Sequence, residues 1–206
     1  MSLSFGEVEA MSKKAARGAG YSWGIAEEAG WATRWLCAQS VDGCSALASL
    51  LKRGESGTLG KSQISLASGR IQGHGAQPLC PLSTGAALSD HAKLIPLDGF
   101  SLGPLAEPVL LMPFLGLIAR AHQTTLALIS PDFDMCTDGH RLACTGPVPA
   151  SVAQASLKFG GPMPKPNPLA QRADPPPAAW QTLERFAHRT YAPASEHSRQ
   201  AGAGPD

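Results

Sequence analysis

The sequence has few aromatic residues, few charged residues and no excess of either charge. Aromatic side chains make up 6% of its 206 residues and charged side chains 16%, with 17 Lys and Arg against 16 Asp and Glu. Phosphate binding needs clustered basic side chains. Because the chain has no such cluster, we expect no nucleic acid among its partners.

Long apolar runs are also missing. The most apolar uncharged run extends from Pro108 to Ala119, and Pro113 and Gly116 interrupt it. A membrane-spanning helix needs about 20 predominantly apolar residues. We therefore expect no membrane segment.

The cysteines lack the even number and regular spacing of a disulfide framework. The first nine residues lack the basic start and apolar stretch of a secretory signal. Together these features favour reduced thiols and a cytoplasmic location. The five cysteines are Cys37, Cys44, Cys80, Cys136 and Cys144.

No cofactor-binding motif is complete. The nearest match to a phosphate-binding loop, Gly54–Ser62, has Glu55 where the first glycine is required. We therefore expect no cofactor.

The first quarter of the chain follows helical spacing. Ser4 and Glu7 form an S-x-x-E capping box for a helix that Gly18 and Gly20 terminate. A second helix is predicted over 22–39, and a third begins after the capping residue Asp42. Gly24 and Gly30 lie inside the second helix, where glycine usually indicates close approach of another backbone.

The middle of the chain has strand-like apolar runs. Val109–Met112 and Leu126–Ile129 are predicted to be buried strands. A short helix is expected to run to Ala92, with Ser83 or Thr84 as its cap.

Asp138-Gly139 predicts a hairpin with a two-residue type I′ turn. Cys136 then lies on the opposite face from His140 and Cys144, so these three side chains do not converge on a metal ion. We therefore expect no metal site. The predicted pairs are Thr137 with His140, Met135 with Leu142, and Phe133 with Cys144.

The segregation of helical and strand patterns predicts one α+β domain. A helical layer, residues 1–53, packs on a small β-rich half, residues 54–159. A proline-rich strap, 160–177, leads to a C-terminal helix and tail, 178–206. In that helix, predicted over Ala178–Thr190, the buried stripe contains Trp180, Leu183, Phe186 and Ala187.

An aromatic and charged face on the second helix is the first candidate binding site. Glu27 and Arg34 lie two turns apart on one face with Trp31 between them. Such a face lines a pocket or a partner surface, or else is a solvated helix face packed through its tryptophans. The candidate binding residues here are Glu27, Glu28, Trp31, Arg34 and Trp35.

The best candidate for a nucleophile is Cys80, with Asp90 and His91 nearby in sequence. A reactive thiolate needs an adjacent base or positive charge. Cys80 and His91 are eleven residues apart, so the sequence alone does not establish contact. The alternative is a buried cysteine and an exposed helix end.

The C-terminal tail is the third candidate. We expect Tyr191 to bury its ring and residues 191–199 to fold back on the helical layer. Glu196 or Arg199 would then face Glu27, Glu28 and Arg34. A disordered tail is the alternative.

Several stretches together resemble a mainly proteobacterial family of proteins of much the same length as this chain and of unknown function. The family has no assigned activity, so the resemblance implies a stand-alone bacterial protein and no catalytic roles. The stretches are Lys14–Gly20, Trp23–Gly30, Arg34–Leu36, Cys80–Pro81, Gly85–Asp90, Pro113–Phe114, Thr190–Glu196 and Ser198–Arg199.

Two classes of function fit these observations. The favoured one is a non-catalytic intracellular binding or accessory protein, with a second copy of the chain or another protein as its partner. The alternative is a small enzyme or small-molecule binder that uses Cys80 and His91 with the Glu27/Glu28/Arg34 face.

Overall fold

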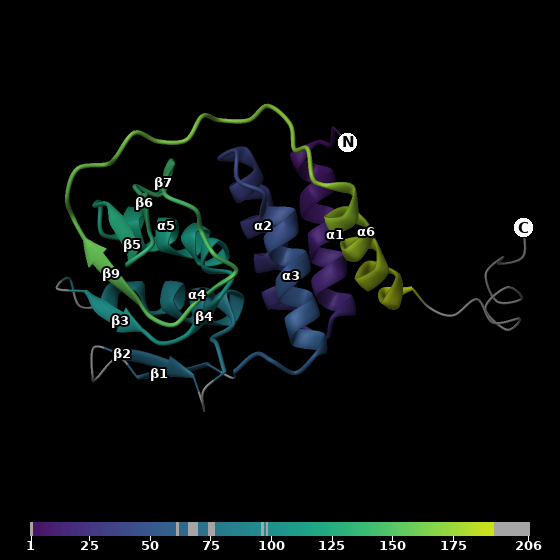
Figure 1. Ribbon diagram of the computed structural model, residues 1–206, viewed down its shortest axis with the longest axis horizontal. Coiled ribbons are helices and arrows are strands. Elements are labelled where there is room, and N and C mark those ends of the chain that lie inside the picture. Colours follow the sequence, from purple (N-terminus) through teal and green to yellow (C-terminus); the bar gives the residue numbers. More distant parts are fainter. Residues whose placement is uncertain are drawn as a thin grey trace, which may run out of the picture.

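The computed structural model describes residues 2–60, 62–65, 70–73, 77–95, 97 and 99–191. Figure 1 shows a layer of helices on one side of the molecule and the strands on the other. The N-terminal helices and the C-terminal helix form the layer, and the middle of the chain forms the β-rich half. This arrangement confirms the predicted α+β fold.

The helical layer is formed by α1, α2, α3 and α6. α1 packs against α2 and α6, and α3 also contacts both α2 and α6. The elements are α1 (Phe5–Gly18), α2 (Trp23–Ala38), α3 (Gly43–Glu55) and α6 (Pro177–Ala187).

Side chains cap the first three helices as predicted. The Ser4 hydroxyl accepts a hydrogen bond from the Glu7 N–H, and the Glu7 carboxylate accepts one from the Ser4 N–H at 2.7 Å. The Ser22 hydroxyl and the Asp42 carboxylate accept from N–H groups in the first turns of α2 and α3. Each bond satisfies a donor that the helix leaves free. Local chemistry therefore sets where these helices begin.

α1 and α2 approach closely at Gly30. A Cβ atom at this position would lie 2.8 Å from the Glu9 carbonyl oxygen and 3.2 Å from the Lys13 Cβ. The predicted close approach is confirmed at Gly30, but it is wrong for Gly24, around which nothing lies within 4 Å. Gly24 is exposed near the start of α2, where no other helix covers it.

α6 closes the layer through the predicted apolar stripe. Trp180, Leu183 and Phe186 are buried. The helix ends at Ala187, and a 3₁₀ turn, η4 (His188–Thr190), completes the stretch predicted to be one helix. The Phe186 carbonyl contacts Gly18 of α1 so closely that a Cβ there would clash with it.

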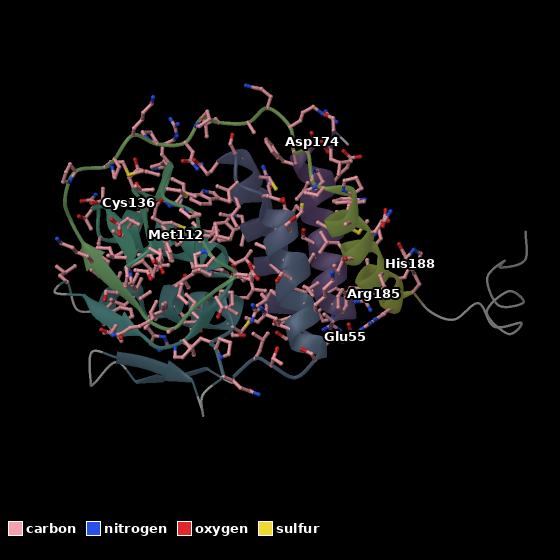
Figure 2. All side chains as sticks on the ribbon, viewed as in Figure 1. Glu55, Met112, Cys136, Asp174, Arg185 and His188 are labelled. Carbon is pink, nitrogen blue, oxygen red and sulfur yellow. The ribbon has the colours of Figure 1, made fainter. Side chains whose placement is uncertain are left out.

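Two arginines of this C-terminal stretch bind one carboxylate of α3. Arg185 donates to both Glu55 oxygens, at 3.3 and 3.0 Å, and Arg189 also pairs with Glu55. Figure 2 shows Glu55 and Arg185 at the same end of the helical layer. Hydrogen bonds from Arg185 and then Arg189 lower the pKa of Glu55 to about 2.

The main sheet has the strand order β1-β2-β3-β9-β5-β6-β7, and β2 pairs with β3 in parallel while the other pairs are antiparallel. A small sheet joins β4 to β8. The strands of the main sheet are β1 (Ser62–Ser65), β2 (Arg70–Gly73), β3 (Phe100–Leu102), β5 (Leu126–Ser130), β6 (Phe133–Thr137), β7 (Leu142–Thr145) and β9 (Ala155–Phe159), and those of the small sheet are β4 (Leu105–Ala106) and β8 (Ser151–Val152).

The β6–β7 hairpin forms, but its predicted register is wrong. Thr137 pairs with Leu142 and Met135 with Cys144, so the loop contains four residues instead of two. The Asp138 carboxylate accepts hydrogen bonds from the N–H groups of His140 and Arg141, at 2.8 and 2.7 Å, and this Asx geometry closes the wider loop. Because the pairing moved by two residues, each side chain keeps its predicted face.

Two predictions for the short elements are also wrong. Val109–Met112 is not a strand, because Pro108–Leu111 forms the 3₁₀ helix η3 and Met112–Ala121 forms α5. All of Pro108–Gly116 is buried, and a continuous apolar run does not distinguish a buried strand from a buried helix. α4 (Pro81–Asp90) begins before Ser83 because Pro81 takes its first turn, and η2 (Ala92–Leu94) follows it.

Residues 160–176 connect β9 to α6 with no helix and no named strand. In Figure 1 this segment passes from the β-rich half over to the helical layer. The Asn167 N–H donates to the Leu142 carbonyl, and the Ala170 N–H donates to the Ala38 carbonyl. Leu3 and Ala173 exchange backbone hydrogen bonds. The segment therefore bonds to both halves of the molecule.

No helix in the described ranges is long and apolar enough to cross a membrane.

The contact at Gly30 predicts opposite effects for two substitutions in α2. Gly30→Ala inserts a methyl group between two backbones and should lower the free energy of unfolding by about 1–3 kcal/mol. Gly24→Ala places the same methyl group in open space and should raise it by up to about 1 kcal/mol. Urea denaturation measures both. Equal effects at the two sites would contradict the close packing of α1 on α2.

The Glu55 pair predicts an acid-sensitive contribution to stability. The pKa of Glu55 is lower in the folded protein than its ordinary value of 4.5, so the contribution is present above pH 4.5 and is lost as the pH falls towards about 2. Glu55→Gln should therefore lower the melting temperature at pH 7 and have a smaller effect at pH 2.5. Glu184→Gln, on α6, is the matched control. A Glu55→Gln deficit of the same size at both pH values would show that the ion pair does not contribute.

Candidate functional site

The predicted face of α2 forms one wall of a cleft of about 500 Å³. α1 supplies a second wall and α5 a third. The cleft is lined by Glu9, Lys13, Glu27, Glu28, Trp31, Leu117 and Arg120. We call it the α1–α2–α5 cleft.

Two ion pairs join α1 to α2 beside this cleft. Lys13 Nζ lies 2.6 Å from Glu27 Oε1, and Arg34 Nη1 lies 2.9 Å from Glu9 Oε2. All four side chains are substantially exposed, so each pair contributes little to stability. Their main effect is to neutralise these four charges in place.

Glu28 differs from these acids because it has no such partner. It is half-buried and makes no hydrogen bond or ion pair with any part of the chain that the structure describes. Burial raises the pKa of Glu28, and the negative charges of Asp90 and then Glu27 raise it further. Asp90 is the last residue of α4, and α4 contacts α2. Glu28 is therefore a carboxylate of the cleft that no cation neutralises by direct pairing.

Trp31 gives the cleft an aromatic wall. It is half-buried, and its ring meets the edge of Phe114 at a centroid distance of 5.8 Å and an angle of 76°. Since Phe114 is fully buried in α5, Trp31 is fixed from behind while part of its surface stays open to the cleft.

The structure brings together three of the five residues predicted on this face. Glu27, Glu28 and Trp31 line the cleft. Arg34 is paired with Glu9 at its edge, whereas Trp35 packs against the hydrophobic core and does not line the cleft.

The cleft also contains residues that the analysis of the second helix did not identify. Arg120 and Leu117 come from α5, and Glu9 and Lys13 come from α1. The helical spacing of each segment could have placed these residues on one face of a helix, but it could not have shown that this face lies opposite α2.

The predicted nucleophile group does not assemble. Cys80 precedes the first residue of α4 and His91 follows the last one, so the ten-residue helix, about 15 Å long, separates them. Cys80 is buried with its sulfur 3.3 Å from the Tyr21 hydroxyl. His91 is exposed, and its Nδ1 lies 2.9 Å from the Ala87 carbonyl oxygen. Asp90 instead acts on Glu28.

The tail prediction is tested only at its first residue. Tyr191 is 58% exposed and its ring meets the edge of His188, so its predicted burial is wrong. Glu196 and Arg199 lie outside the described residues, and their proposed contacts with α2 stay a prediction.

A second buried carboxylate escaped the sequence analysis. Glu107 is only 6% exposed and its φ of 41° lies in the left-handed region. Ser49 donates a hydrogen bond of 2.5 Å to it, and Arg53 Nε lies 3.8 Å away. Burial raises the pKa of Glu107, against the lowering effects of Ser49 and Arg53. The sequence did hold one signal for a buried carboxylate here, because Glu107 is a charged residue within an apolar run and stands directly before Pro108.

Glu107 lines a separate cavity of about 480 Å³ between α3 and the β-rich half. Its carboxylate is already satisfied by Ser49 and Arg53, and a left-handed non-glycine residue is strained. These contacts explain how the residue is held and point to no particular ligand.

Within the described ranges, no group of three or more His, Cys, Asp or Glu side chains has the arrangement needed to hold a metal ion.

Residues 3–90 match a family described as a protein of unknown function (DUF3726). The match extends from α1 to α4, so it includes the α2 wall of the cleft and Asp90. It confirms the predicted resemblance to a domain of unknown function over this part of the chain. No curated protein matches the sequence.

The environment of Glu28 predicts a pH-dependent stability. Its folded-state pKa is raised above the ordinary value of 4.5, so folding disfavours the charged form. The free energy of unfolding is then highest below pH 4.5 and decreases as the pH rises through the raised pKa. Glu28→Gln removes this loss.

The variant should therefore melt at a higher temperature than the wild type at pH 7 and at the same temperature at pH 3. The gain should stay below about 1 kcal/mol, because solvent screens a half-exposed charge. Thermal unfolding followed by circular dichroism measures it. A Glu28→Gln variant that is less stable at pH 7 would reveal a favourable partner for the carboxylate.

Proposed function

We propose that this protein is a non-catalytic binding protein whose α1–α2–α5 cleft binds a positively charged group, an ammonium or a guanidinium. The observation that carries the proposal is the half-buried, unpaired Glu28 beside Asp90. Burial and the neighbouring acids disfavour the ionised form of Glu28, so a ligand cation would be attracted to this carboxylate and would relieve the repulsion among the acids.

The aromatic wall favours the same ligand chemistry. A cation over a tryptophan face gains about 0.5–2 kcal/mol, depending on how far it is desolvated. Trp31 lines the cleft together with Glu28. The site therefore combines a carboxylate and an aromatic ring, and both attract a cation.

The cationic side chains of α1 and α2 at the cleft form ion pairs with other glutamates and not with Glu28. Lys13 is bound to Glu27, and Arg34 is bound to Glu9. Arg120 is exposed on the opposite wall. It could bind a carboxylate or carbonyl of the same ligand, which would favour ligands with both kinds of group.

The cationic group has two sources, a free amine or a lysine or arginine side chain of a protein partner, including a second copy of this chain. The cytoplasmic location, the bacterial origin and the lack of nucleic acid among its partners remain predictions from the sequence. The alternative function is an enzyme that uses Cys80 and His91. The structure does not favour it, because these residues lie at opposite ends of α4.

Isothermal titration with two kinds of probe tests the proposal. Agmatine represents free amines, and blocked tripeptides with a central lysine or arginine represent protein side chains. We expect at least one probe to bind, with an affinity that falls as salt is added. Glu28→Gln should weaken that binding at least about tenfold, or ~1.4 kcal/mol.

Glu184→Gln removes a carboxylate from α6, away from the cleft, and should leave the affinity unchanged. The preferred probe identifies the source of the cation. No binding of any probe at millimolar concentration, or equal binding by the wild type and Glu28→Gln, would overturn the proposal.

A further inference from the structure

Cys37 and Cys44 meet where α2 passes into α3. Cys37 lies in the last turn of α2 and Cys44 is the second residue of α3. The turn between them reverses the chain through Ser40, whose φ is 57°. A Cβ at Gly43 would lie 2.9 Å from the Thr33 carbonyl oxygen and 3.0 Å from the Leu36 Cβ. The start of α3 therefore packs directly on the last turns of α2.

The two thiols are in direct contact and are not equivalent. The side chains of Cys37 and Cys44 interact with each other, and the backbone N–H groups of Gly43 and Cys44 also act on the Cys37 sulfur. These interactions lower the pKa of Cys37, although burial and the Asp42 charge oppose them. The pKa of Cys44 is raised by the same contact and by burial. The contact therefore favours a thiolate on Cys37 over one on Cys44.

Only one member of the pair reaches solvent. Cys37 is 7% exposed and lines a cavity of about 270 Å³, whereas Cys44 is fully buried. The opposite wall is the connecting segment, residues 170–175. The hydrogen bond from the Ala170 N–H to the Ala38 carbonyl holds it there. A water molecule occupies about 30 Å³, so hydrogen peroxide fits into this cavity easily.

We propose that Cys37 and Cys44 are a peroxide-reactive dithiol in which Cys37 attacks and Cys44 resolves. The Cys37 sulfur attacks one oxygen of the peroxide, the O–O bond breaks, and the released hydroxide takes up a proton to form water. Cys37 is then a sulfenic acid. The Cys44 sulfur displaces its hydroxyl group, which leaves as a second water once the Cys44 proton is transferred. The dithiol is oxidised by two electrons, and one peroxide is reduced to two waters.

The other cysteines provide an internal comparison. Burial raises the pKa of both Cys136 and Cys144, which favours their unreactive thiol forms. The Cys80 sulfur is buried against the Tyr21 hydroxyl. Across the β6–β7 pair, Cys136 lies opposite Ala143 and Cys144 opposite Met135, so neither of these two faces another cysteine there.

The connection to the rest of the molecule runs through the turn. Ser40, Val41 and Asp42 line the dithiol cavity and also the cavity of Glu107. A disulfide has narrow limits on the distance and angle between its sulfurs. Its formation therefore constrains a turn that borders both cavities.

Peptide mapping of the intact chain tests the proposal. The reduced protein is treated with hydrogen peroxide, remaining thiols are blocked with N-ethylmaleimide, and the protein is digested with a protease that cleaves before aspartate. Cleavage before Asp42 separates Cys37 from Cys44, and a second digestion with trypsin, which cleaves after Lys52, separates Cys44 from Cys80. We expect these two peptides to stay linked until a reductant is added, while Cys80, Cys136 and Cys144 are recovered as blocked thiols.

Two variants separate the roles of the thiols. Cys44→Ser should accumulate a sulfenic acid on Cys37 that dimedone traps, whereas Cys37→Ser should leave Cys44 unoxidised. Cys144→Ser is the matched control and should form the same disulfide as the wild type. Two results with the wild-type protein alone would overturn the proposal. One is that the Cys37 and Cys44 peptides stay unlinked after peroxide treatment, and the other is that Cys80, Cys136 or Cys144 is oxidised before the Cys37–Cys44 disulfide forms.

Discussion

The close contact of α1 with α2 sets the geometry on which the helical layer and the cleft depend. Gly30 lets α2 approach the Glu9 carbonyl, and this short separation allows side chains of the two helices to pair. The pairs Lys13–Glu27 and Arg34–Glu9 follow from it. These two ion pairs neutralise the charges of Lys13, Glu27, Arg34 and Glu9, and Glu28 is left without an ion-pair partner among the described residues. A backbone contact thus determines which acid in the cleft is uncompensated.

Three glutamates illustrate how environment distinguishes identical side chains. Glu55 is on the surface and is held by two arginines, so its pKa is lowered. Glu107 is buried and its pKa is raised, although it has a hydroxyl donor and an arginine nearby. Glu28 has its pKa raised with no such donor. Glu28 and Glu107 both have a raised pKa and both line a cavity, but only Glu28 has no hydrogen-bond donor or ion-pair partner among the described residues, which is the arrangement expected of a binding site.

Features determined by nearby residues could be predicted from the sequence. Ser4 with Glu7, Ser22 and Asp42 each act within three residues, and the helices begin where these caps indicate. The hairpin was predictable in kind, because Asp138-Gly139 favours a turn. Its register was not, since the Asp138 side chain can close a four-residue loop as well as a two-residue one.

Features determined by distant partners could not be predicted in the same way. Val109–Met112 is buried on all sides, so it carries no helical or strand period. On the α2 face, the pattern indicated Glu27, Glu28 and Trp31 correctly but could not show that Trp35 turns towards the core or that α5 supplies Arg120. Cys80 and His91 show the opposite failure. They are close in sequence, but the helix between them holds them at its two ends and so keeps them apart.

The position of α6 has a consequence for the order in which the chain folds. This helix packs on α1 and α3, yet it follows them by more than a hundred residues. A ribosome adds about 5–20 residues per second, so α1 emerges many seconds before the Phe186 backbone that covers Gly18. Until α6 is synthesised, the apolar groove that it fills on α1 and α3 would stay open. The connecting segment, which bonds to β7, α2 and Leu3 in turn, would bring α6 to that groove only once the sheet is complete.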